Sequence, residues 1–366
     1  MEVMSPEGPS RAARGGLVLG IALATCPATA VAANWERVVF AYDFAAAPEG
    51  PLDPTVWIIN HPGSWWWVQG RTQFPNYGPW YPASEFPRVL GGACVIEHHH
   101  FNPHDGDDPN TTFLGGEIRA VAPFSPDRCY RFEAAVRCYA YPRGLVTSFF
   151  LYGFDGSKSD EIDFEFVSNR TSDDATYPGG DPVLTNTWNE SSQKPLYVVP
   201  AGLDLAQVNT FRIYWYPTLR RIDWTWRDPA GVEKTLRKET APGAVPDEPM
   251  NLYFNFWAPA PNWPDAYSAA LQPVNGPAQN QVFRYDVLRV EVRELTLCKA
   301  DFDRDGDVDA DDLLAYLPCH SRPLQSLPAG CETRDLDGDG DADQGDFGIL
   351  QRCYSGRGEP ADAGCA

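Results

Sequence analysis

Short runs of alternating apolar and polar residues fill the chain from about residue 33 to residue 298. The runs 211–216 (FRIYWY) and 288–293 (LRVEVR) are examples. Side chains of a β-strand point alternately to its two faces, so each run predicts a strand with one face in a core and the other toward water. The 31 Gly and 34 Pro residues favour many turns. The pattern therefore predicts antiparallel strands in two packed sheets.

One run, 161–166 (EIDFEF), carries an acid at every second position. On a strand, Glu161, Asp163 and Glu165 share one face, while the apolar residues between them point into the core. Like charges this close raise one another's pKa values, which favours a site that uses protonated and ionised carboxyl groups together. The alternative is an amphipathic strand whose wet face is acidic without a catalytic purpose.

Paired carboxyl groups of this kind are what hydrolysis of a glycosidic bond requires. A retaining enzyme needs a nucleophilic carboxylate and a carboxylic acid roughly 5 to 5.5 Å apart. Four residues of strand span about 13 Å between Cα atoms, so Glu161 and Glu165 must lean together, and their long side chains supply that reach. The charge of Asp163 between them would help to keep Glu165 protonated. The spacing does not say which Glu attacks.

The run 159–166 (SDEIDFEF) resembles the active-site strand of glycoside hydrolase family 16, in the unbulged form of lichenases and xyloglucan transglycosylases. Segments 115–119 (GGEIR), 185–189 (TNTWN) and 255–257 (NFW) resemble further parts of that family. The resemblance implies a mainly β, concanavalin-A-like jelly-roll sandwich with an open cleft over about residues 40–297. It also implies that Glu161 is the nucleophile, Asp163 the assisting acid and Glu165 the general acid/base. Residues 167–168 and about 62–108 depart from the family, which leaves the choice of polysaccharide open.

Aromatic side chains would form the platforms of a sugar-binding cleft, because sugars present apolar faces to aromatic rings. Our candidates are Trp188, Trp257 and Trp263, with Asn186 as a partner for sugar hydroxyl groups. A place in the hydrophobic core is the alternative for each Trp.

After residue 298 the composition changes to Asp and Gly, and residues 301–312 recur as residues 335–346. Oxygen ligands at positions 1, 3, 5, 9 and 12 with Gly at position 6 are what a twelve-residue calcium loop requires. The expected side-chain ligands are Asp301, Asp303, Asp305, Asp309 and Asp312, then Asp335, Asp337, Asp339, Asp343 and Asp346, with main-chain carbonyls at Asp307 and Asp341. The repeat predicts two structural calcium ions; a disordered acidic tail is the alternative.

This segment resembles a dockerin-type domain, a small α-helical domain built on two EF-hand-type calcium loops. The resemblance implies that each loop leads into a helix, packed through Leu313, Leu314, Leu317, Phe347, Ile349 and Leu350. It further implies a cohesin-like or cell-surface protein as partner. Four cysteines (319, 331, 353 and 365) depart from the cellulosomal type and keep a surface-attachment or self-docking role open.

The N-terminus and the net charge restrict location and partners. Basic residues, a short apolar run and a small-residue site over residues 11–33 predict a cleaved secretory signal, too short to anchor in a bilayer. A lipid-attachment site at Cys26 is a weaker alternative. Removal of the signal leaves eight cysteines, an even number that favours disulfides in an exported protein. A net charge of −21 argues against nucleic acid or an anionic membrane surface as a partner.

Together these features predict a signal peptide over residues 1–32, a family 16-like catalytic domain over 33–298 and a dockerin-like calcium-binding domain over 299–366. The leading hypothesis is a secreted, retaining endo-β-glycosidase of a neutral β-glucan, similar to an endo-1,3-1,4-β-glucanase (EC 3.2.1.-), with no cofactor for catalysis. A transglycosylase and a non-catalytic polysaccharide-binding lectin are the alternatives.

Overall fold

The structure is a computed structural model that describes residues 36–59, 66–75, 87–103, 112–170, 179–190, 192–295, 298–303, 306–323, 325–357, 359 and 361. The predicted signal peptide, Asp305 and Cys365 lie outside these residues. Within the described part of the chain, none of the helices combines the length and the apolar character needed to cross a bilayer.

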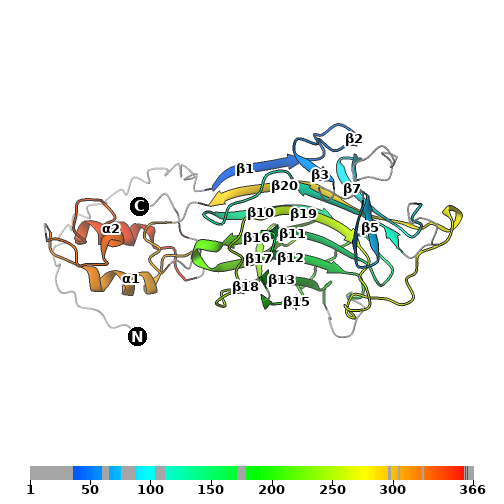
Figure 1. Ribbon diagram of the computed structural model, residues 1–366. Helices are drawn as coiled ribbons and strands as arrows, with labels where there is room; N and C mark the ends of the chain where they lie inside the picture. Colours follow the sequence, from blue (N-terminus) through cyan, green and yellow to red (C-terminus); the bar gives the residue numbers. More distant parts are fainter. Residues whose placement is uncertain are drawn as a thin grey trace, which may run out of the picture. The chain divides into compact units, whose positions relative to one another are not determined.

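Two β-sheets dominate the described residues (Figure 1). The path of the 12-stranded sheet is β18 (Glu233–Glu239), β17 (Arg221–Arg227), β16 (Asn209–Tyr216), β10 (Cys129–Arg137), β20 (Val282–Leu295), β7 (Ala93–His99), β8 (Phe113–Leu114), β5 (Thr72–Pro75) and β4 (Trp66–Gln69). Strand β1 (Glu36–Asp43) pairs with β20, β6 (Arg88–Leu90) with β7, and β2 (Gly50–Pro51) with β6.

The 8-stranded sheet follows the order β14 (Ser192–Gln193), β13 (Val183–Asn189), β12 (Ser159–Val167), β11 (Val146–Phe154), β19 (Asn251–Trp257), β9 (Gly116–Ala120) and β3 (Trp57–Ile59), with β15 (Leu196–Val198) on β13. Neighbouring strands of this sheet run antiparallel. Short 3-10 helices are η2 (Pro217–Leu219) and η3 (Pro277–Gln279). The two packed sheets that the alternating pattern predicts are confirmed, and they are antiparallel except where β5 pairs with β8 in parallel.

The core between the sheets is built from the inward positions of the alternating runs. Phe211, Ile213 and Trp215 of β16 are all fully buried, as the period of two predicts. Strand β20 departs from its simple pattern, because the pairing with β10 shifts register beside Leu288. Val287 therefore faces the core in place of Leu288, which is only partly buried.

The repeated acidic segments form two nearly identical loop–helix units, ending in α1 (Ala310–Tyr316) and α2 (Gln344–Cys353). In each unit the last acid, Asp312 or Asp346, accepts backbone N–H groups from the start of its loop and from the N-cap of its helix. Gly306 and Gly340 take the left-handed conformation at position 6, with φ of +94° and +97°. The sequence repeat is thus also a structural repeat, with a capping box at each helix start.

Equivalent hydrogen bonds join the two loop–helix units to each other. Ser321 lies between the units and its Oγ accepts the N–H of Ala342 at 3.0 Å, while Ser355 Oγ accepts the N–H of Val308 at 2.9 Å. Each serine N–H in turn donates to the carbonyl of the same partner residue, at 2.8 Å and 2.9 Å. Residues 34 positions apart therefore play the same role, which gives the module a local two-fold symmetry.

The predicted packing residues of this module are only partly correct. Ile349 and Leu350 are buried and Leu313 and Phe347 partly buried, but Leu314 and Leu317 are 63 % and 53 % exposed. The reason is that Tyr316, equivalent to Leu350, takes the core position of the short helix α1 and is 1 % exposed. The second unit has Gly348 and Gln351 where the first has the two exposed leucines, so these positions form the outer face.

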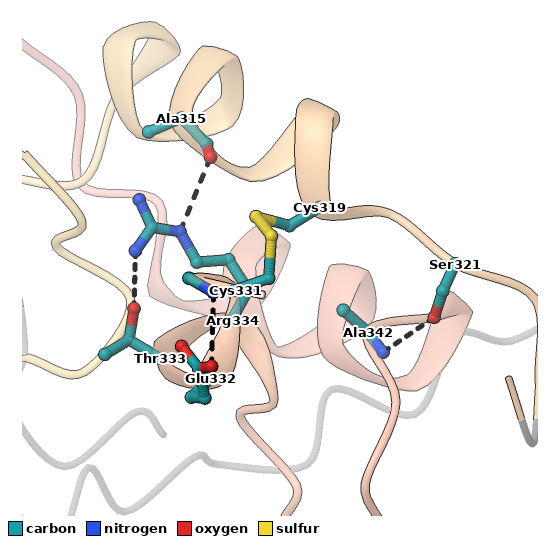
Figure 2. The surroundings of a disulfide bond; sticks show 9 residues. Ala315, Cys319, Ser321, Cys331, Glu332, Thr333, Arg334 and Ala342 are labelled. Carbon is teal, nitrogen blue, oxygen red and sulfur yellow. Dashed lines mark hydrogen bonds between the residues drawn. A yellow bond between two sulfur atoms is a disulfide. The ribbon is translucent and has the colours of Figure 1, made fainter. Parts of the chain in front are cut away.

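A disulfide joins Cys319 and Cys331, which confirms the disulfide prediction for the segment that links the two units (Figure 2). The bond lies between η4 (Leu317–Cys319) and η5 (Glu332–Arg334). Beside the disulfide, Arg334 Nε donates to the carbonyl of Ala315 at 3.4 Å. The hydrogen bond from the N–H of Ala342 to Ser321 Oγ lies nearby. Cys353 is also disulfide-bonded.

The expectation of disulfides is wrong for three cysteines of the sandwich. Cys94, Cys129 and Cys138 are free thiols, between 0 % and 3 % exposed. Cys129 begins β10 and Cys138 follows its last residue, so a nine-residue strand of about 30 Å separates them. These side chains fill the core as small apolar groups, and burial raises the pKa of Cys138 to about 12.

Candidate active site

The acidic face of β12 is held in place from the opposite side of the strand. Ile162, Phe164 and Phe166 are at most 2 % exposed and pack in the core between the sheets, as predicted. Trp224 of the other sheet donates from Nε1 to the carbonyl of Asp163 at 2.9 Å. The middle of β12 is therefore fixed both by packing and by a buried hydrogen bond.

Asp160, on the core side of β12, fixes the end of the strand. Its carboxylate accepts the backbone N–H groups of Glu190 at 3.2 Å, Asp247 at 2.9 Å and Glu248 at 3.1 Å. Asp160 and Glu161, which are neighbours on β12, therefore have different roles, because alternate side chains point to opposite faces of the sheet.

Strand register places three rows of functional side chains across the outer face of the sheet. The first row is Trp188, Glu161, Tyr152 and Asn251; the second is Asn186, Asp163, Phe150, Tyr253 and Arg119; the third is Glu165, Ser148, Asn255 and Glu117. Neighbouring strands lie about 4.8 Å apart, so adjacent members of a row are within contact distance. The predicted residues Asn186 and Trp188 therefore flank the three predicted acids.

The three acids interact directly. A hydrogen bond joins the side chains of Glu161 and Asp163, and Asn186 makes a second one to Asp163. Burial raises the pKa of Glu161 to about 7 and, with the charge of Glu161, that of Glu165 to about 8. Burial, followed by the charges of both Glu residues, raises the pKa of Asp163 well above its usual range. Near neutral pH this face holds a mixture of protonated and ionised acids.

Glu117 is a fourth acid of this face and was not among the sequence candidates. Burial raises its pKa to about 7, and the charge of Glu161 adds to this, while Asn255 opposes it by donating at 3.3 Å. The signal was available in the segment GGEIR, whose alternation puts Glu117 and Arg119 on one face. The sequence could not show that this strand lies in the same sheet as β12, with β11 and β19 between them.

Several buried polar atoms of this face have no hydrogen-bond partner among the described residues. They are Asn186 Oδ1, Asn255 Oδ1, Trp257 Nε1 and Arg119 Nε. Buried polar groups are nearly always paired in folded proteins. A cluster of unpaired donors and acceptors beside four acids therefore favours a face built to bind a hydroxyl-rich ligand.

The tryptophan candidates fall into two environments. Trp188 is partly exposed and lies opposite Glu161. Trp257 is 8 % exposed, and its ring lies 5.7 Å from that of the partly exposed Trp263. Both belong to an apolar cluster with Val146, Val167 and Leu184 at one end of the acidic face. Trp257 therefore has a packing role, the alternative considered from the sequence, while its indole nitrogen remains unpaired.

Carboxylate groups of the C-terminal acids cluster in the structure, and Asp307 and Asp341, expected to bind through main-chain carbonyls, contribute their side chains to these clusters. Carboxylate oxygens lie within 4.8 Å of one another in four groups: Asp301, Asp303 and Asp312; Asp307, Asp309 and Asp312; Asp335, Asp337 and Asp346; and Asp341, Asp343 and Asp346. Such all-oxygen, all-acidic groups fit a hard cation such as Ca²⁺. Asp339, an expected side-chain ligand, is in none of these groups; it is exposed and accepts the N–H of Asp341 at 3.2 Å.

Comparison with known proteins agrees with the likeness seen in the sequence. Residues 128–271 match the family model described as Glycosyl hydrolases family 16. The matched segment contains β12 with its three acids, as well as β13 and β19. Comparison with curated protein sequences finds no match.

Several solved structures are similar to this chain at low sequence identity. The catalytic domain of an endo-1,3-beta-glucanase (laminarinase) from Thermotoga petrophila is 13 % identical, and the match covers 71 % of this chain and 98 % of that one with a TM-score of 0.50. The endo-beta-1,3-glucanase from Pyrococcus furiosus is 15 % identical, with coverage of 71 % and 95 % and a TM-score of 0.50. A beta-glucanase from Bacillus licheniformis is 20 % identical, with coverage of 70 % and 97 % and a TM-score of 0.47. The first two matches confirm the jelly-roll fold of the sandwich.

Proposed function

We propose that the protein is a retaining endo-β-glycosidase that cleaves a neutral β-glucan on the acidic face of β12. The observation that carries the proposal is the pair of Glu side chains on one strand face, with the pKa of Glu161 raised to about 7 and that of Glu165 to about 8. Such a pair can hold one ionised and one protonated carboxyl group at neutral pH, which is the state that double displacement requires.

In the first step Glu165 donates its proton to the glycosidic oxygen of the leaving sugar while the Glu161 carboxylate attacks the anomeric carbon. The carbon–oxygen bond to the leaving group breaks as the ester bond to Glu161 forms. In the second step Glu165, now ionised, removes a proton from water, whose oxygen attacks the same carbon and releases Glu161. Asp163 orients Glu161 through their hydrogen bond.

The pairing of β12 supports a lichenase-like arrangement of the acids. Residues 159–167 pair with β11 without a shift in register, and residues 160–165 pair with β13 in the same way. The strand is therefore unbulged, with one residue between successive acids. By this likeness we propose mixed-linkage β-1,3-1,4-glucan as the preferred substrate. Asn186 would bind its hydroxyl groups, and the partly exposed Trp188 and Trp263 its ring faces, while Trp257 would support Trp263 from the apolar cluster.

We also propose that the C-terminal module binds two structural calcium ions and docks the enzyme to a cohesin-like or cell-surface protein. The four groups of acids and their exact repetition support calcium binding. The bound cations would offset the repulsion between the carboxylates and so stabilise the module. We further propose that the enzyme is secreted, on the strength of the N-terminal sequence pattern.

The test is release of reducing ends from mixed-linkage glucan, laminarin, xyloglucan, agarose and κ-carrageenan by wild type and by Glu161→Gln. We expect wild type to cleave the mixed-linkage glucan fastest and the variant to cleave none of them. A labelled acceptor oligosaccharide in the same reaction separates hydrolysis from transglycosylation. Wild type that retains polysaccharide without cleaving any of the five would make the protein a lectin and contradict the proposal.

A further inference from the structure

Phe154 ends strand β11 on the same face as the acids. Side chains alternate along the strand, so Phe150, Tyr152 and Phe154 follow one another on this face. The ring of Phe150 stacks on that of Tyr253 at 5.0 Å, and Tyr152 meets Tyr253 edge-on at 6.0 Å. Phe154 is two residues, or about 7 Å, beyond Tyr152, which lies opposite Glu161.

Phe154 differs from the other aromatic residues of the sandwich in its exposure. In the described part of the sandwich it is the one aromatic side chain that is mostly exposed, at 61 %. Phe150, by comparison, is 7 % exposed. Single exposed apolar residues are common, but this one continues a row of rings that begins beside the acids.

The backbone under Phe154 is held rigidly. In the hairpin between β11 and β12, Asp155 Oδ1 accepts the N–H groups of Ser157 at 2.7 Å and of Lys158 at 2.8 Å. A Cβ atom on Gly153 would lie 2.3 Å from the carbonyl oxygen of Pro249, so glycine lets the strand end approach that segment closely. A backbone fixed in this way presents the side chain of Phe154 at a defined place on the face, and loses little conformational entropy when a ligand binds.

Polar residues lie next to Phe154 in the hairpin and across the strands. Ser159 pairs with Phe154 across the strands and lies on the same face. Lys158 forms an ion pair with Glu190, which takes a left-handed conformation with φ of 57° at the end of β13. An apolar ring face beside hydroxyl and charged groups is the combination that binds a sugar ring.

We infer that Phe154 forms an additional sugar-binding subsite beyond Tyr152, where its ring stacks on a hexose unit of the bound glucan distant from the cleaved bond. This inference rests on the proposed function and adds to it a residue that determines preference for long substrates. Phe154 is a binding residue here and takes no part in the chemical steps.

The test compares kcat/KM of wild type and Phe154→Ala on oligosaccharides of increasing length, prepared from whichever polysaccharide wild type cleaves fastest. For the longest oligosaccharides we expect the variant to lose about three- to tenfold through a higher KM, in line with the energy of one aromatic stacking contact. For the shortest oligosaccharide that is cleaved we expect no change. Phe154→Trp, which keeps an aromatic ring, should restore the preference for long substrates.

Val232→Ala is the matched control, because Val232 is 49 % exposed between β17 and β18 of the other sheet. An equal loss on all lengths, or the same length dependence in Val232→Ala, would overturn the subsite. Unchanged kinetics of Phe154→Ala on every length would overturn it as well. If wild type cleaves no polysaccharide, the proposed function itself fails, a result distinct from normal cleavage without a role for Phe154.

Discussion

Acidic residues cluster in two regions of the protein, and the groups around the acids differ between the two regions. On the face of β12 the acids stand among aromatic rings and other acids, and burial raises the pKa of Glu161 and Glu165. In the C-terminal loops, Asp312 and Asp346 instead accept backbone N–H groups at the starts of helices. The first environment favours bound protons, while the second holds carboxylate oxygens together in groups that could hold a cation. Acids at similar spacing along the chain can therefore serve proton exchange in one environment and the proposed binding of a cation in another.

The largest expected effect comes from removing the proton donor of the first region. Glu165→Gln should lower kcat by between about 10²-fold and about 10⁴-fold, the usual contribution of a general acid. Glu97→Gln on β7 is the control and should keep full activity, since Glu97 pairs with Arg88 and His99 away from the acidic face. Initial rates on the best polysaccharide provide the measurement. Equal activity of both variants would remove Glu165 from the mechanism.

The dependence of wild-type activity on pH should reflect the protonation of Glu165. Because Glu165 must be protonated in the first step, activity should fall as the pH rises through its pKa of about 8. Glu161 must be ionised, so activity should also fall below its pKa of about 7. The maximum should therefore lie near neutral pH, with apparent pKa values that belong to the coupled acids. A maximum near pH 4.5 would show that burial does not control these groups.

Removing one acid from the second region should affect metal binding and leave catalysis unchanged. Asp346 contributes to both acid groups of its loop. Asp346→Ala should weaken calcium binding at that loop by more than about 100-fold, since losing even an indirect supporting group costs 10- to 100-fold. Asp311→Asn, at an exposed position outside the proposed ligands, serves as the control. Calorimetric titration after treatment with EDTA measures both. A wild type that binds no calcium would contradict the comparison.

The smallest expected effect is a pH-dependent change in stability. The pKa of Glu117 is raised to about 7, so the fold is favoured while Glu117 is protonated and loses this contribution as the pH rises through 7. Glu117→Gln stays neutral and should therefore raise the Tm of the sandwich at pH 9 and change it little at pH 5. A difference of about 2–4 °C corresponds to 1 kcal/mol for a domain of this size.

Glu291→Gln is a control for which the same thermal unfolding experiment should show the opposite change in Tm. Hydrogen bonding and ion pairing with Arg293 lower the pKa of Glu291, so its contribution to stability is present at high pH. This variant should therefore lower the Tm at pH 9. The same shift in both variants would show that the two environments do not differ as described.

Local sequence patterns predicted the parts of the site that lie on one segment. The period of two along 161–166 put three acids on one face and their neighbours in the core, and the structure confirms this. The 34-residue repeat likewise predicted two equivalent loops, because each loop is a local unit. Spacing within one strand or one loop is enough to fix such arrangements.

Features that depend on the order of the strands in the sheets could not be predicted from the sequence. Glu117 joins the site because β9 lies beside β19, which pairs with β11. The free thiol of Cys94 and the bulge at Leu288 also follow from packing between distant segments. The exposure of Leu314 depends on which side of α1 meets the core, and a helix of seven residues has too weak a periodicity to decide it.

The most direct test of the account is the anomeric configuration of the first product, followed by proton NMR during cleavage of the β-glucan that wild type cuts fastest. If Glu161 and Glu165 act together on one sugar bond, two successive displacements retain the configuration. The β-anomer should therefore appear first and the α-anomer only later, by mutarotation. Initial release of the α-anomer, or cleavage that persists in Glu161→Gln, would contradict it.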